Sequence, residues 1–131
     1  MKIPVTQVVN FAFDIVKETG TALGYRTYKN SLPKDIKQGL VVTATDITFD
    51  DNQQAILFVL AYIPDVISRG NYEHNGAEID RVAAYFAQNL ESVHVQGTSY
   101  RMELDGQSVE NGDDGNSHVV SNRFLFTFNA E

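Results

Sequence analysis

The sequence predicts an α+β domain, spanning residues 1–131, in which two helices pack on a mainly antiparallel sheet of about four strands. Segments 5–18 and 77–91 repeat apolar residues at helical spacing. Segments within 40–63 and 93–130 show the alternating or continuous apolar runs of strands. The predicted order is therefore helix, strand, strand, helix, strand, strand.

The first helix is predicted from an apolar stripe after Pro4, a residue that suits a first helical turn. Thr19 and Gly20 predict its end. Periodicity then fails from 21 to 38, and a connection of this length is usually functional or irregularly folded. The stripe consists of Val5, Val8, Val9, Ala12, Ile15 and Val16.

The first strand pair differs in its expected exposure. Segment 40–51 alternates, which predicts that Val41, Thr43, Thr45, Ile47 and Phe49 share one face. Asp50, Asp51 and Asn52 predict a turn. Segment 55–63 is apolar throughout, which predicts a central strand covered on both faces and ended by Pro64. Residues 68–76 are rich in turn formers and predict a loop.

The second half predicts a helix over Ala77–Glu91 and a final hairpin. A strand begins at Val93, and Gly97 marks a bulge or a break where the alternation changes parity. The last strand aligns Phe124, Phe126 and Phe128 on one face. Between these strands, residues 105–118 are acids, amides and glycines, which predict a long hairpin tip that is mobile when alone.

The charge is unevenly distributed along the chain. The net charge is −7, but residues 1–40 hold six basic and three acidic side chains, and residues 41–131 hold four basic and fourteen acidic ones. A general nucleic-acid partner is disfavoured because phosphate binding needs a basic field. One basic and one acidic part could complement a second copy, unless folding mixes them.

Several classes of protein are excluded or disfavoured. The chain has no cysteine, which excludes disulfides and thiolate metal sites. Its longest apolar run, Ala55–Ile63, is shorter than the roughly 20 residues that span a bilayer. Polar residues interrupt the N-terminal segment, so we expect a soluble protein without a cleavable signal.

The sequence carries no complete catalytic or metal-binding motif. Stretch 105–118 lacks the ligand order of a calcium loop. His74 and Glu78 could hold a metal or act as acid and base, but a solvated helix start, where acids favour the helix dipole, is the preferred interpretation. We find no nucleophile elbow and no phosphate-binding loop. We therefore predict no enzyme, cofactor or metal, and keep a small ligand-binding or metal-binding domain or enzyme as an alternative.

The element order resembles the tail terminator, or tail completion, proteins of long-tailed phages and related minor capsid and neck proteins. The likeness rests on helices "VTQVVNFAFDIV" and "AEIDRVAAYFAQNL", the strands "LVVTATDITF" and "AILFVLAYIPDV", and the hairpin "SYRMELDG" to "NRFLFTF". It implies a ring, commonly of six copies, at the head-proximal end of the tail tube. The implied partners are other copies, the tube and the head connector, without membrane or sequence-specific nucleic acid. The implied location is the virion, or the bacterial cytoplasm during assembly.

We therefore predict that 105–117 is an assembly arm and that the basic loop is its complementary surface. Tyrosines beside basic residues are typical of interfaces, although base stacking or plain packing would also use them. A nonviral adaptor domain is the other alternative. The candidate interface residues are Tyr25, Arg26, Tyr28, Lys29, Lys34, Lys37, Asp105, Glu110, Asp113 and Asp114.

Overall fold

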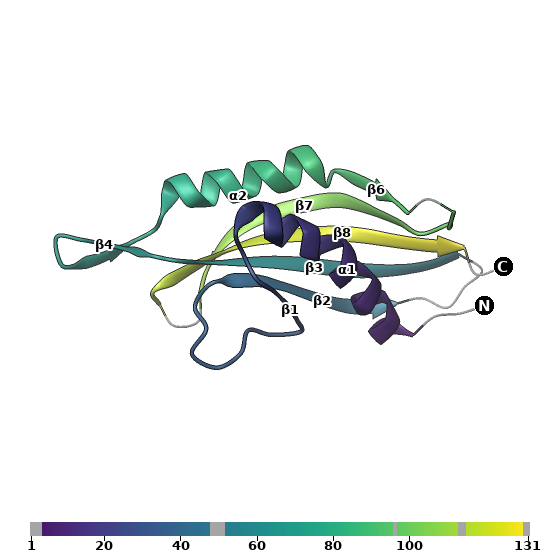
Figure 1. The fold of residues 1–131 in the computed structure, drawn as a ribbon, viewed down its shortest axis with the longest axis horizontal. Helices are drawn as coiled ribbons and strands as arrows, with labels where there is room; N and C mark the ends of the chain where they lie inside the picture. Colours follow the sequence, from purple (N-terminus) through teal and green to yellow (C-terminus); the bar gives the residue numbers. More distant parts are fainter. Residues whose placement is uncertain (1–3, 48–51, 96, 113–114, 130–131) are drawn as a thin grey trace.

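A computed structural model describes residues 4–47, 52–95, 97–112 and 115–129, and it confirms the α+β class (Figure 1). The helices are α1 (Val5–Leu23) and α2 (Gly76–Asn89). The strands are β1 (Thr27–Lys29), β2 (Gly39–Ile47), β3 (Asn52–Pro64), β4 (Val66–Ser68), β5 (Asn71–Glu73), β6 (Ser92–His94), β7 (Arg101–Asn111) and β8 (Ser117–Asn129).

The predicted four-strand antiparallel sheet is wrong in detail. Six strands join in the order β1-β2-β3-β8-β7-β6, and β4 and β5 form a separate hairpin. The sheet is mixed because β1 runs parallel to β2, whereas the other pairs are antiparallel. The strands β1, β4, β5 and β6 have three residues each. Such short segments show no measurable alternation, so the sequence pattern could not reveal them.

Helix α1 runs past its predicted stop at Thr19 and Gly20 and ends at Leu23. Its cap is Gly24, whose backbone φ of 83° is left-handed and whose N–H bonds to the Gly20 and Thr21 carbonyls. Thr19 and Gly20 are buried. Gly20 therefore serves close packing, and the termination signal belongs to Gly24.

We expect Gly20→Ala to lower the free energy of unfolding by about 1–3 kcal/mol through overpacking, although alanine favours a helix over glycine by about 1 kcal/mol. A Cβ at Gly20 would lie 2.5 Å from both the Thr27 Oγ1 and the Tyr25 carbonyl oxygen. Urea unfolding would measure the change, with exposed Thr21→Ala as the control. A stabilised Gly20→Ala variant would mean that α1 does not approach β1 this closely.

Strand β3 lies at the centre of the sheet and ends at Pro64, as predicted. Both helices pack on one of its faces (Figure 1). The other face carries the half-buried side chains Ile56, Phe58 and Leu60 and is covered by neither helix. The prediction of a strand covered on both faces is thus wrong for the isolated chain. The helix-covered core includes Val16, Leu40, Leu57, Val82, Phe86, Met102, Phe124 and Phe126.

Two register shifts, one in β2 and one in β7, break the predicted alternation of side chains between the two faces. In β2 the shift lies between Ala44 and Ile47, and both side chains pack against the helix-covered core. Ile47 therefore does not share a face with Val41 and Thr43. The predicted positions of Thr48, Phe49, Asp50 and Asp51 lie outside the described residues.

Of the two alternatives predicted at Gly97, a bulge or a break, the structure has the break, because Gly97 lies between two separate strands. β6 pairs antiparallel with β7, with Val93 opposite Met102. Gly97 has a φ of 81°, a conformation that glycine adopts without strain. The parity of the apolar residues changes there because the chain reverses.

The predicted long hairpin tip is mostly strand. Residues Gly106–Asn111 of β7 pair with His118–Arg123 of β8, so the connection shrinks to 112–116. The backbone of a polar segment can complete a ladder as well as an apolar one, because the N–H and C=O groups do not depend on the side chain. The mobile hairpin tip predicted over 105–118 is therefore wrong for 105–111 and 117–118, which are strand residues.

Helix α2 occupies nearly the predicted segment. The Asn75 side chain caps it by accepting a hydrogen bond from the Glu78 N–H at 3.4 Å. Hydrogen bonds from Gln107 of β7 join α2 to the sheet: its side chain donates to the Ala83 carbonyl at 3.0 Å and to Asn122 Oδ1 at 2.7 Å. The fully buried Asn122 side chain in turn donates to the Val59 carbonyl.

Candidate assembly interface

Three connections leave the sheet at the same end, which we call the connection end. Gly39 pairs with Tyr62, Tyr62 with Val119, and Val119 with Glu110. These four residues form one row across the sheet. Loop 30–38, the β4–β5 hairpin and the turn at 112–116 therefore all lie at this end. Figure 1 shows the β4–β5 hairpin projecting beyond the N-terminus of α2.

The β1 side of the connection end is basic, and we call it the basic edge. Arg26 and Lys29 are exposed at the ends of β1, and Lys34 and Lys37 are exposed in the following loop. The Arg26 guanidinium lies 5.8 Å from the centre of the half-buried Tyr28 ring. A Cβ at Gly39 would approach that ring to 2.8 Å. Tyr28 is thus packed at this edge and supports it.

The β7 side of the connection end carries one described acidic candidate, Glu110, and we call this side the acidic edge. Asp105 is the extra residue of the β7 register shift and forms an ion pair with Arg123 at 3.5 Å. Its charge is therefore already balanced within the chain. Glu110 is exposed near the end of β7. Asp113 and Asp114 lie outside the described residues.

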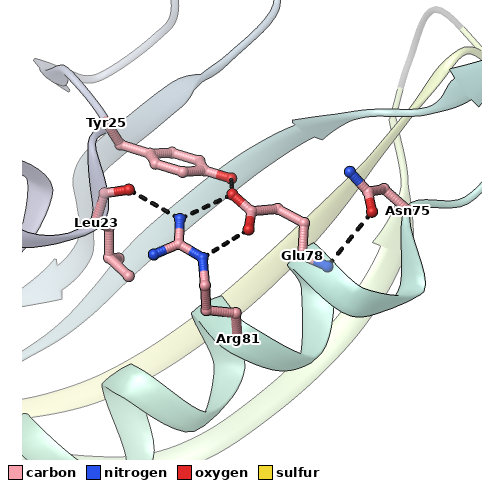
Figure 2. Close-up of polar contacts among 5 residues, drawn as sticks. All are labelled: Leu23, Tyr25, Asn75, Glu78 and Arg81. Atoms are coloured by element: carbon pink, nitrogen blue, oxygen red, sulfur yellow. Dashed lines mark hydrogen bonds and ion pairs between the residues drawn. The ribbon is translucent and has the colours of Figure 1, made fainter.

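Tyr25 is not the exposed interface side chain that the sequence predicted. It is only 5% exposed, and its hydroxyl donates to Glu78 Oε2 at 2.7 Å. Two nitrogens of Arg81 donate hydrogen bonds to the same carboxylate, at 2.6 and 2.9 Å, and Arg81 also donates to the Leu23 carbonyl (Figure 2). Tyr25, Glu78 and Arg81 thus join the end of α1 to the start of α2.

The contacts among Tyr25, Glu78 and Arg81 shift the pKa values of Tyr25 and Glu78. Burial, followed by the hydrogen bond to Glu78, raises the pKa of the Tyr25 hydroxyl well above its ordinary value. The hydrogen bonds from Arg81 hold the pKa of the Glu78 carboxyl below its ordinary value. At neutral pH Glu78 is therefore charged and Tyr25 neutral, so the hydrogen bonds that join α1 to α2 are maintained. We call Tyr25, Glu78 and Arg81 the clamp.

We expect the alkaline stability of the protein to depend on Tyr25. Tyrosine in the unfolded chain ionises near pH 10, whereas folded Tyr25 keeps its proton. The stabilisation is complete below about pH 10 and is lost as the pH rises further. In Tyr25→Phe, urea unfolding at pH 7 should show a loss of about 1.5–3 kcal/mol, and the fall between pH 10 and 11 should become shallower. An unchanged alkaline slope would contradict the proposed clamp.

The β4–β5 hairpin was not predicted. Part of it lies in segment 68–76, for which the sequence predicted a loop. Arg69 and Gly70, with φ of 52° and 79°, form its tight turn. Its side chains Val66 and Ile67 are 43% and 69% exposed. The only local signal was the Arg69-Gly70 pair after the short apolar segment Val66–Ile67. At its base, His118 Nδ1 lies 2.6 Å from Asp65 Oδ1, and the His74 ring is 5.6 Å from that of His118.

The two residues of the alternative metal or acid–base site, His74 and Glu78, have different partners in the structure. His74 lies beside His118, whereas Glu78 is bound to Tyr25 and Arg81. Within ranges 4–47, 52–95, 97–112 and 115–129, no group of three or more histidine or acidic side chains could hold a metal ion. Neither described helix is long and apolar enough to span a membrane.

No protein-family model matches the chain. No curated protein matches it either.

Proposed function

We propose that this protein is a structural subunit that assembles head to tail with copies of itself, in the manner of the phage tail terminators that its element order resembles. One observation carries the proposal: the basic and acidic edges lie at the same end of the sheet but on opposite sides of it. Two different, complementary edges favour a contact between unlike surfaces.

When copies join through two unlike surfaces, the first and last copies of the chain each keep one unused surface. Further copies can therefore add until a rotation between neighbours closes the chain into a ring. Opposite charges would orient each new subunit before contact. The described edges contribute Arg26, Lys29 and Lys34 on one side and Glu110 on the other. All the connection ends would then face the same side of the ring.

On this proposal the ring, of six copies as is common in the resembled family, sits at the head-proximal end of a phage tail tube and joins the tail to the head. One rim would contact the tube and the other the head connector. The protein would act in the virion and, during assembly, in the bacterial cytoplasm. The α+β class and the two-helix packing support this assignment, because the resembled family has the same class.

A second candidate, an adaptor that binds one different protein, is favoured by the β4–β5 hairpin. Val66 and Ile67 are exposed on a hairpin that projects from the body. Paired strands of this size are marginally stable alone. A partner that covered them would stabilise the hairpin.

Light scattering and electron microscopy of the purified protein separate the two candidates. We expect closed rings at high protein concentration, and weaker association at high salt because exposed charges are screened. A strictly monomeric protein at both low and high salt would overturn the ring proposal. A defined two-component complex without closed symmetry would support the adaptor.

A further inference from the structure

A pocket of about 290 Å³ lies between α1 and β1 at the basic edge, and we call it the groove. A separate pocket of about 210 Å³ adjoins Lys29 and the start of α1. The Phe13 ring and the Tyr25 side chain supply apolar surface in the groove, while Lys17 and Arg26 supply positive charge. The residues that line the groove are Phe13, Lys17, Thr21, Tyr25, Arg26 and Thr27.

The strand register places a specific side chain level with this groove at the opposite edge. Thr27 pairs with Leu40, Leu40 with Ala61, Ala61 with Val120, and Val120 with Val109. The three central residues belong to the helix-covered core. Because residues of one row share a face, Val109 points to the side of the sheet on which the groove opens.

Val109 is an exposed apolar residue on an otherwise polar segment. It is 53% exposed, and its neighbour Glu110 carries an exposed negative charge. Among the described strands, β6 pairs with β7 only over Arg101–Glu103, so the outer side of β7 around Val109 has no neighbouring strand. An uncovered strand edge is a template for pairing with another chain.

We propose that Val109 of one copy docks into the groove between α1 and β1 of the next copy. This inference rests on the proposed head-to-tail assembly and specifies its contact. The apolar side chain would fill the space beside Phe13, and Glu110, which points to the opposite face of the sheet, would lie near Arg26. The chain directions make β7 of the first copy antiparallel to β1 of the second when both copies keep the same end up. Backbone pairing could then continue the sheet.

Because the chain has no cysteine, engineered disulfides test this contact directly. The test variant combines Val109→Cys with Thr21→Cys, since Thr21 is an exposed residue of the groove wall. Each copy then carries both halves of the contact. Mild oxidation should give a ladder of covalent oligomers longer than dimers, removed by reductant. Each single variant should give dimers at most.

A second readout and a matched control make the outcomes distinct. Val109→Ser should weaken association about tenfold, measured by sedimentation, if the contact buries this side chain, and the melting temperature should not change. The control pair combines Ile67→Cys with Thr21→Cys. If it gives the ladder and the Val109 pair does not, the β4–β5 hairpin occupies the groove and the inference is overturned.

Assembly of the unmodified protein without a Val109 ladder would overturn the docking contact and leave the proposed function standing. An unmodified protein that stays monomeric would overturn both.

Discussion

Replacing Phe86 by alanine should lower the free energy of unfolding by about 3–5 kcal/mol. Phe86 is fully buried on α2 and belongs to the helix-covered core. Its removal takes away apolar burial and leaves a cavity that rigid strands cannot easily close. A loss of this size is a large part of the total free energy of unfolding of a typical domain. The variant should therefore be close to unfolding at physiological temperature.

Urea and thermal unfolding would measure this loss. Gln88→Ala, an exposed position on the same helix, should change stability by less than about 0.5 kcal/mol. A loss below about 1 kcal/mol in Phe86→Ala would be too small for a buried aromatic side chain. Such a result would contradict the packing of α2 on the sheet.

The second large effect concerns assembly and not folding. Arg26→Glu should weaken self-association by about tenfold or more, because a like-charge contact across an interface is strongly unfavourable. Thr27 pairs with Leu40, so the preceding residue, Arg26, lies level with Gly39. Gly39 begins the row that ends at Glu110 on the opposite edge. Glu110→Arg should weaken association similarly.

The double variant with both reversals should regain most of the lost association, because the two charges are exchanged and the attraction is restored. Sedimentation at low salt measures all four proteins. Both side chains are exposed, so their melting temperatures should agree. If the double variant associates as weakly as the singles, Arg26 and Glu110 do not meet, and the edges contact each other differently or not at all.

The sequence pattern was sufficient for the parts of the fold that bury large apolar surfaces over many residues. Both helices, the central strand β3 and the phenylalanine face of β8 follow directly from their periodicity. The end of α1 was misplaced because Gly20 and Gly24 are equally plausible stops in one dimension. Only the approach of β1 shows that Gly20 is needed for packing.

Within the candidate interface, the sequence identified the charged residues but not their roles. Arg26, Lys29, Lys34 and Glu110 are exposed as an interface requires. Tyr25 is instead part of a clamp with Glu78. Its partner is 53 residues away in the chain, and no local pattern encodes such a distance.

By itself, the sequence determined the class of the fold, the long elements and the separation of charge between the two parts of the chain, since these depend on local spacing and composition. The tertiary structure alone decided that the basic loop and the acidic strand end lie at one end of the sheet on opposite edges, and that Val109 is level with the groove. The physical reason is that strand order depends on which distant segments pair, and the backbone hydrogen bonds that join them are the same for every residue type except proline.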